Sequence, residues 1–323
     1  MPSQTVQYGA GCDGGQQTSP KREGREGTEL DGSACFSEDI ESARRRFLAA
    51  CDRIGLRITS YRGNTPDGDP TLFCDVTRLG SPDAKSVAVL CSAAAGPAGL
   101  IGCGIALGVV EAGGLRDLPR DVALVLVHAA NPGGPIWNQP PLPPQLPGGT
   151  TDLPHSPGHA IDWSILRDKP ITAMAPGLWD VDVLKEIAAT RLARVEKLCV
   201  IDTRAGHGPF GDVRVISADP DPSAARTRGE RWFAPGLGKP KDDEPSQLTP
   251  CGGGLSANLT GVRATNVVLE FGTRRTADVL FEGRDARRAA LSSYPTDPVW
   301  RTNAWRCARQ TLQQAYKGLQ SDT

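Results

Sequence analysis

The sequence predicts an α/β domain with a mixed, mainly parallel sheet and helices on both of its faces. Apolar runs such as "KSVAVLC" and "DVALVLVH" lack the alternation of a half-exposed strand, and such runs are typical of strands buried on both sides. Segments with helical periodicity or many glycines separate these runs. Buried strands that alternate with helices favour a parallel sheet covered by helices.

The composition favours one large domain. The chain has 323 residues, 39% of them hydrophobic, which is enough to bury a sizeable core. Its formal net charge is −1, with basic and acidic residues interspersed, so we expect no nucleic-acid partner. No apolar stretch is long enough to span a bilayer, and the N-terminus lacks the hydrophobic region of a signal peptide. We expect a soluble protein whose partners are other proteins, with no membrane span.

The cysteines indicate a reducing environment. There are nine of them, scattered singly and without a CxxC pair. An odd number of dispersed cysteines in a chain of this size favours reduced thiols over a disulfide framework. We therefore expect an intracellular location, in the cytosol or an organellar matrix.

The first 34 residues differ from the rest of the chain. Residues 1–34 are rich in Gly, Ser, Thr and charge and contain few large apolar residues, so they are expected to form a disordered or partner-dependent arm. A single domain is expected over residues 35–323. It starts with a helix that has Ser37 as a plausible cap. Its apolar stripe consists of Ile40, Ala43, Phe47, Cys51 and Ile54.

The remaining elements follow in order. Extended segments are predicted at 57–63, 72–80 and 85–91, a glycine-rich helix at about 99–112, buried strands at 121–131, 198–206 and 264–273, and helices at 181–197 and 299–320. The last helix carries an apolar stripe of Trp305, Ala308, Leu312, Ala315 and Leu319. Ligands of such folds bind beyond the carboxyl ends of the strands, here at 92–99, 128–134, 202–208 and 270–273.

A dinucleotide-binding turn is one reading of "AAGPAGLIG". That fingerprint needs its first glycine for the tight turn and an acidic residue at the end of the next strand. Ala94 stands at the position of the first glycine, and the next strand ends in "VLVHAAN", which contains no acid. The sequence therefore disfavours this reading.

A second reading uses all four strand ends together. The chain has "SARRRF", "SAAAGPAGLIGCG", "HAANPGGPIW", "IDTRAGHGPFG" and "EFGT" in this order. From about residue 36 to residue 319 it thereby resembles the DUF2817 group, which is itself similar to the zinc carboxypeptidases of the M14 class. The four strand-end fragments, in this order over most of the chain, are specific for the fold. They are not specific for the activity.

The resemblance implies a metal site whose ligands are missing. In the family, a His and a Glu of "HGVEG" and the His of "DLHTG" bind zinc. The matching positions here are Ala95, Ala98 and Arg204. A methyl group has no lone pair to donate, and a protonated guanidinium repels a dication. We therefore expect no metal and no cofactor.

The substrate anchor that the resemblance implies is also missing. In the family, an Asn/Arg motif that follows "NPYGF" grips the substrate's carboxylate. The corresponding region here, "WNQPPLPPQLPGGTTDLPHSPGHAIDW" at 137–163, contains no arginine, and a proline-rich loop is expected at 132–160. The resemblance leaves Glu270, the family's general base, and Asp202 as remnants. A vestigial pocket of Ala95, Ala98, Asp202, Arg204 and Glu270 is the expectation.

Other polar residues offer alternatives. His128 closes a buried strand and is expected to be a core histidine, and His207 lies in a predicted loop at the pocket rim. His155 and His159 are separated by a proline, so their spacing carries no helical ligand geometry. Ser92 lacks the GxSxG elbow of a serine hydrolase.

The residues favour a catalytically inactive, M14-like pseudoenzyme with a structural or regulatory role as a subunit of a larger assembly. The alternative is a metal-dependent carboxypeptidase or amidohydrolase that uses substitute ligands around His128, His207 and Glu270. A small-molecule binding protein that uses the emptied pocket stays open as a third class. If the metal is gone, we expect Arg204 to pair with Glu270 or Asp202, because a buried, unpaired carboxylate is costly.

Overall fold

The structure is a computed structural model, which describes residues 5–7, 30–62, 73–92, 97–112, 117–130, 179–220, 222–234, 237–238, 255–256, 258–274 and 294–321. All structural statements below concern these residues. The predicted proline-rich loop at 132–160, with His155 and His159, lies outside them, and so does Ala95.

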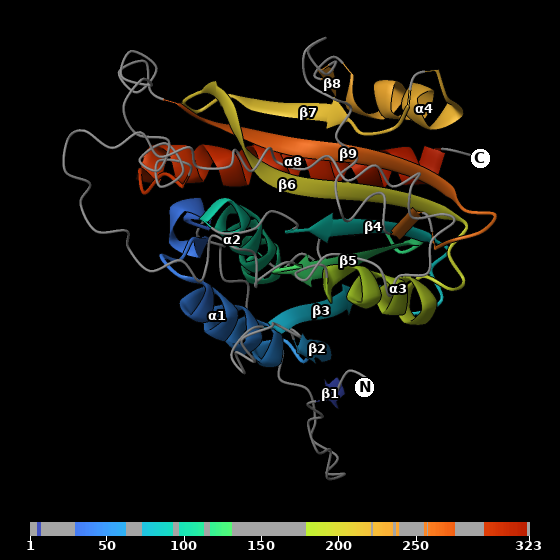
Figure 1. Cartoon of the computed structure of the whole chain (residues 1–323), viewed down its shortest axis with the longest axis horizontal. Coiled ribbons are helices and arrows are strands. Elements are labelled where there is room, and N and C mark those ends of the chain that lie inside the picture. Colours follow the sequence, from blue (N-terminus) through green and yellow to red (C-terminus); the bar gives the residue numbers. More distant parts are fainter. Residues whose placement is uncertain are drawn as a thin grey trace, which may run out of the picture.

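One sheet runs through the described part of the molecule (Figure 1). Its strand order is β1-β2-β3-β5-β4-β6-β9-β7-β8. The strands are β1 (Thr5–Gln7), β2 (Ile58–Arg62), β3 (Phe73–Leu79), β4 (Ser86–Cys91), β5 (Val122–His128), β6 (Lys197–Pro209), β7 (Val213–Ser217), β8 (Leu237–Gly238) and β9 (Arg263–Arg274). The central strands β5, β4, β6 and β9 are parallel neighbours, and antiparallel pairs flank them. The predicted mixed α/β sheet is confirmed.

Helices cover the sheet on both faces. They are the 3-10 helix η1 (Gly32–Cys35), α1 (Ile40–Arg53), α2 (Pro97–Glu111), α3 (Trp179–Arg191), α4 (Ala224–Phe233) and α8 (Pro298–Ser321). The larger core cluster joins α1, α2, α4 and α8 to one side of the sheet, called the α8 face below. A second cluster joins α3 to the other side, called the α3 face.

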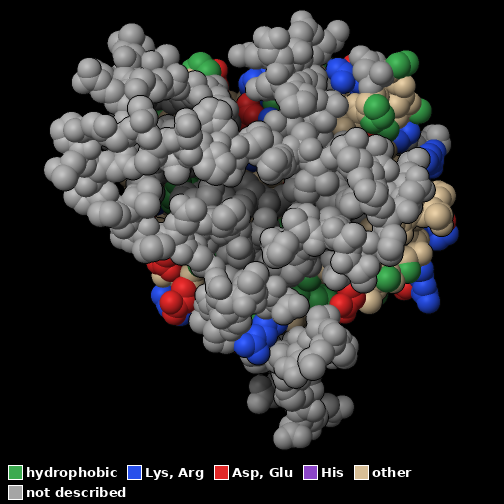
Figure 2. All heavy atoms as spheres, in the orientation of Figure 1, with side chains coloured by type: hydrophobic (Ala, Val, Ile, Leu, Met, Phe, Trp, Pro, Cys, Tyr) green, Lys and Arg blue, Asp and Glu red, His purple; other side chains and the backbone are tan. Residues whose placement is uncertain are grey.

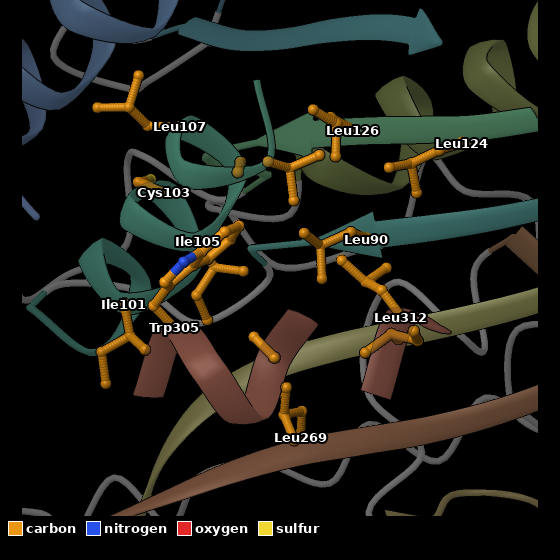
Figure 3. Packing of buried hydrophobic residues seen from close by; sticks show 14 of the residues in the cluster. Leu90, Ile101, Cys103, Ile105, Leu107, Leu124, Leu126, Leu269, Trp305 and Leu312 are labelled. Carbon is orange, nitrogen blue, oxygen red and sulfur yellow. The ribbon is translucent and has the colours of Figure 1, made fainter. Parts of the chain in front are cut away.

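Strand β5 shows how the sheet separates the two cores. Its residues alternate between them, with Leu124 and Leu126 in the cluster on the α8 face and Val125 and Val127 in the one on the α3 face. Every residue of β5 is buried, as the unbroken apolar run predicts. Figure 3 shows Leu126 and the neighbouring Leu90 on the α8 face, where helices α2 and α8 pack against the sheet.

The glycines of α2 let this helix approach both the sheet and α8. A Cβ at Gly102 would collide with the side chains of Ser92, directly after β4, and Thr203, in the middle of β6. A Cβ at Gly108 would lie 2.8 Å from the indole ring of Trp305 in α8. The glycines therefore allow close packing of α2, because larger side chains would push this helix away from the sheet.

The N-terminal boundary differs from the predicted one. Ordered packing begins by Leu30, since η1 is capped by Asp31 and Gly32 is buried against Trp305. The segment Thr5–Gln7 pairs with β2 as an antiparallel strand. The expectation that residues 1–34 pack little against the domain is wrong for these segments. A side-chain cap and one glycine contact are invisible in the composition on which that expectation relied.

The first long helix begins later than expected. Its N-cap is Asp39, whose carboxylate accepts the Ser42 N–H, whereas Ser37 is buried and accepts a hydrogen bond from Arg46. The predicted stripe is buried at Ala43, Phe47 and Cys51, but Ile54 is 43% exposed as the C-cap. The 3.6-residue period is therefore correct for the helix body and fails at its end.

Other differences concern the C-terminal half. Strand β6 continues beside β9 to Pro209, so His207 lies in a strand and not in the predicted loop, at a register shift between Gly206 and Pro209. The strands β7 and β8 and helix α4 were not predicted, and α3 ends at Arg191 instead of residue 197. The stripe of the last helix is buried as predicted.

Two further features bear on the compositional expectations. Cys91 is disulfide-bonded, which contradicts the expectation that all thiols are reduced. Other cysteines of the described segments, such as Cys103 and Cys199, are free. No helix in these segments is long and apolar enough to cross a bilayer. On the face in Figure 2, the coloured basic and acidic side chains are interspersed instead of gathered in one patch.

Candidate functional site

Strands β6 and β9 bring the predicted site residues together. Arg204 and Glu270 are directly opposite each other in the parallel pairing of these strands. Asp202 precedes Arg204 by two residues and is the partner of Cys91 at the end of β4. The pair therefore lies beyond the end of β4, where ligands of parallel sheets bind.

Arg204 and Glu270 form a salt bridge, as the sequence predicted. Arg204 Nη2 lies 2.6 Å from Glu270 Oε2, and Arg204 Nε donates to the same oxygen over 2.9 Å. The Glu270 side chain is 5% exposed and that of Arg204 23%. On the opposite side, Arg214 of β7 places Nη1 3.6 Å from Glu270 Oε1. Both oxygens of this buried carboxylate thus face a guanidinium group.

The salt bridge lies on the α3 face of the sheet. Leu269 and Phe271, which flank Glu270 in β9, belong to the core on the α8 face. Successive side chains of a strand point to opposite faces, so Glu270 points to the α3 face. Its strand partners Arg204 and Arg214 meet it there. A row across three neighbouring strands therefore holds one carboxylate between two arginines.

The residues present do not fit a zinc ion at this position. A guanidinium group has no lone pair to donate and stays protonated. Here Arg204 forms a salt bridge with Glu270 Oε2, an oxygen that a metal ion would need as a ligand. The side chain of Ala98, at the start of α2, lies outside the described part, as does Ala95. No cluster of three His, Cys, Asp or Glu side chains with metal-binding geometry occurs among the residues that were placed.

His128 belongs to a different environment from Glu270. Its ring stacks on Phe47 of α1 at a centroid distance of 4.5 Å, which places it on the α8 face. It is fully buried, and no hydrogen-bond partner for either ring nitrogen occurs in the described segments. Burial lowers the pKa of His128 to about 4, so the ring is neutral near pH 7. Because the sheet separates them, His128 and Glu270 cannot share a metal ion, and the predicted set of substitute ligands is wrong in this respect.

A second buried ion pair lies next to His128. Asp75 of β3 is the strand partner of His128 and is fully buried. Arg44 of α1 donates to both of its oxygens, over 2.7 Å from Nε and 3.2 Å from Nη2. The hydroxyl of Ser60 in β2 donates to Oδ1 as well. This cluster fastens α1 to the sheet, and the sequence analysis missed it.

Ser92, His128 and Asp75 lie on three neighbouring strands, but their contacts are not those of a catalytic triad. Ser92 Oγ donates to the Gly99 carbonyl oxygen over 2.5 Å, and Asp75 is paired with Arg44. All three side chains are at most 2% exposed, so no substrate reaches them. Burial also raises the pKa of the nearby Cys103 thiol to about 12, so it is not a thiolate nucleophile.

Arg214 was also missed, although the sequence contains a signal for it. It stands between Val213 and Val215 in "DVRVIS", an alternating pattern that is typical of a strand with one polar face. The local pattern does not show which strand pairs with this segment, because that strand is distant in the sequence. Only the antiparallel pairing of β7 with β9 places Arg214 opposite Glu270.

Structural comparison aligns the chain with solved structures at low TM-scores and low sequence identity. LapB from Legionella pneumophila aligns at a TM-score of 0.44 and 9% identity, over 90% of this chain and 66% of LapB. The LapA aminopeptidase of the same organism aligns at a TM-score of 0.44 and 10% identity, over 88% of this chain and 65% of LapA. Succinylglutamate desuccinylase from Chromobacterium violaceum aligns at a TM-score of 0.36 and 15% identity, over 80% of this chain and 75% of the desuccinylase.

Sequence comparison identifies the family. No curated protein matches the chain significantly. A family model described as "Protein of unknown function (DUF2817)" matches residues 36–140 and 177–321, which is most of the chain and includes β4, β6, β9 and α8. The chain therefore belongs to the DUF2817 family.

Proposed function

We propose that this chain is a non-catalytic member of its family, in which an arginine–carboxylate pair has replaced the metal centre. The salt bridge between Arg204 and Glu270 carries this proposal. It uses an oxygen that a metal-bound reaction would require, and it supplies a positive charge without a dication. Because Arg214 faces the other oxygen, both oxygens of Glu270 lie next to a guanidinium group, which leaves neither free to position a reacting water.

The expected pocket of Ala95, Ala98, Asp202, Arg204 and Glu270 is part of the same proposal. In it, Ala95 and Ala98 remove ligands, and Arg204 both removes a ligand and neutralises Glu270. In this proposal the arginine takes over the charge of the lost metal ion. Without it, the buried Glu270 carboxylate would have no partner, which costs on the order of 3 to 5 kcal/mol.

Zinc binding tests the proposal directly. The purified full chain is incubated with zinc, dialysed and analysed for metal, and hydrolysis of peptides and N-acyl amino acids is measured with and without zinc. We expect no stoichiometric zinc and no hydrolysis. One equivalent of tightly held zinc in the unaltered chain would overturn the proposal.

Variants at the three positions sharpen this test. Arg204→His alone should not bind zinc, since positions 95 and 98 still contribute no ligand. The triple variant Ala95→His/Ala98→Glu/Arg204→His should bind zinc in competition with a chromophoric chelator, and Arg204→Gln is the matched control. Zinc binding by Arg204→His alone would show that other ligands form the site.

We further propose that the chain serves as a structural or regulatory subunit of a protein assembly. The proposed contact segments are residues 132–160 and the part of residues 1–34 outside 5–7 and 30–34, which pack on the domain. Chemical cross-linking of the endogenous protein, followed by mass spectrometry, should find partner peptides linked to these segments. A free monomer without such cross-links would contradict the assembly role and leave the zinc test unaffected.

A further inference from the structure

A second candidate binding site lies on the other side of the sheet from the Arg204–Glu270 pair. A pocket of about 560 Å³ opens between η1, the turn after β6 and the first two turns of α8. We call it the α8 pocket, and the lining residues that matter here are Asp31, Phe210, Val299, Trp300 and Arg306. Its volume is in the range of small-molecule sites, which is about 300 to 1,000 Å³.

The floor of the α8 pocket is apolar. Trp300 is 3% exposed, and its indole N–H donates to the Gly272 carbonyl oxygen over 2.9 Å, so its polar atom is already satisfied. The ring of Phe210 lies beside it at a centroid distance of 6.5 Å. Val299, in the first turn of α8, is 78% exposed, an unusual position for a large apolar side chain. An apolar group bound here would remove this surface from water.

A cation stands at the margin of the pocket. Arg306 follows Val299 by two helical turns, so both side chains lie on the same face of α8. No ion pair of Arg306 is found in the described part of the chain, whereas Arg301 and Arg309 of the same helix pair with Glu38 and Asp117. The guanidinium of Arg306 is exposed and available to an anion.

Asp31, the acid in the pocket lining, forms no ion pair with Arg306 in the described part of the chain. The Asp31 carboxylate caps η1, where Oδ1 accepts the Ser33 N–H over 3.0 Å and the Ser33 hydroxyl over 2.8 Å. It therefore has a structural task of its own. At the start of α8, the Asp297 carboxylate accepts the Trp300 N–H over 3.0 Å and offsets the positive end of the helix dipole, so the positive charge of the pocket comes from Arg306.

From this combination we propose that the α8 pocket binds a small amphipathic organic acid. Its ring or branched chain lies against Trp300, Phe210 and Val299, and its acidic group accepts hydrogen bonds from Arg306. The pocket is separated from the Arg204–Glu270 pair by the sheet, since Trp300 packs on Phe271, which points to the α8 face. The proposal does not depend on the loss of catalysis.

A pair of dyes tests both halves of the site. The probe 1-anilinonaphthalene-8-sulfonate carries an apolar ring system and a sulfonate, and N-phenyl-1-naphthylamine has the rings without the charge. Fluorescence titration of the full chain should give saturable binding of the anionic dye. Phenylpropionate should displace it, and phenylpropionamide should do so much less well.

Variants on one helix supply the matched comparison. Arg306→Gln should weaken binding of the anionic dye about tenfold, as expected for the loss of one charge-assisted contact, and leave the neutral dye unchanged. Arg309→Gln, which lies outside the pocket lining, should change neither dye. Val299→Ser should weaken both.

Two results would overturn the proposal. One is a lack of saturable binding of the anionic dye to the folded chain. The other is an equal effect of Arg306→Gln and Arg309→Gln, which would place the dye elsewhere or reduce its binding to general surface charge. Far-ultraviolet circular dichroism of each variant checks that the fold is retained.

Discussion

The sheet carries two buried arginine–carboxylate pairs, one on each face, near the edge where the parallel strands end. In both pairs the arginine side chain is 23% exposed and the carboxylate is buried. Their surroundings differ. Arg44 comes from helix α1 and binds Asp75 through both oxygens, whereas Arg204 and Glu270 come from strands that are already hydrogen-bonded to each other.

This difference separates a structural role from a candidate functional one. The Arg44–Asp75 pair ties a helix to the sheet, so its loss also loosens the packing of α1. The Arg204–Glu270 pair adds little to strands that β-sheet hydrogen bonds already hold. It lies where the resemblance implies a metal site, and in the proposed function it replaces the charge of that metal.

Removal of Arg44 should have the largest effect. Arg44→Ala leaves Asp75 buried with a hydroxyl partner only, so the free energy of unfolding should fall by about 4 to 5 kcal/mol. Urea denaturation measures it. The control is Arg45→Ala. The Arg45 side chain is 66% exposed, and its Nη1 lies 3.7 Å from Glu41 Oε1. Equal effects of the two variants would show that Asp75 does not need its arginine.

Removal of Arg204 should cost less. Arg204→Ala is expected to lower the free energy of unfolding by about 2 to 3 kcal/mol, because Arg214 still faces Glu270. Addition of Glu270→Gln should recover part of this loss, since a neutral amide needs no cation. An Arg204→Ala variant as stable as the parent would mean that the metal position was emptied without compensation.

Acid should act on the α8 face through His128. The folded-state pKa of about 4 lies below the 6.5 of an unperturbed histidine, so between these pH values the unfolded chain binds a proton that the folded chain does not bind. Stability is therefore highest above pH 6.5 and is lost as the pH falls toward 4, by about 3 kcal/mol in all.

A substitution isolates this histidine. In His128→Phe, which keeps a ring against Phe47, the free energy of unfolding should change much less between pH 6.5 and 5 than in the parent. Denaturation curves at several pH values measure this slope. Identical slopes in parent and variant would show that His128 is not the group that titrates.

The smallest expected effect concerns the residue after His128. Ala129 has a φ angle of +55°, a left-handed conformation that costs a residue with a Cβ about 1 to 2 kcal/mol. Ala129→Gly should relieve this strain and raise the thermal midpoint by the equivalent of about 0.5 to 1 kcal/mol. Ala130→Gly, at a buried neighbour without a positive φ, should be destabilising. A lower midpoint for Ala129→Gly would show that the turn is unstrained.

Much of the fold was predictable from local patterns. Two local patterns predicted burial correctly. They are the unbroken apolar runs of β4 and β5 and the 3.6-residue apolar stripe of α8. The ends of elements were less predictable. Asp39 replaced Ser37 as the cap of α1 because the choice depends on where Phe36 and Ser37 are buried, which is a tertiary matter.

The candidate site was partly predictable for a similar reason. The resemblance placed Arg204 and Glu270 at matching positions, and the cost of an unpaired buried carboxylate predicted their salt bridge. Arg214 and the Arg44–Asp75 pair were missed, because each depends on contacts between segments far apart in the chain.

The sequence by itself determined the type of most elements and the residue identities at positions 95, 98 and 204, because residue chemistry and hydrophobic period are local properties. Only the tertiary structure decided on which face each polar side chain lies and which charges meet. Strand order and register decide this, and they separate His128 from Glu270 while bringing Arg204 and Arg214 to the same carboxylate. A sheet has two faces, and a shift of one residue exchanges them.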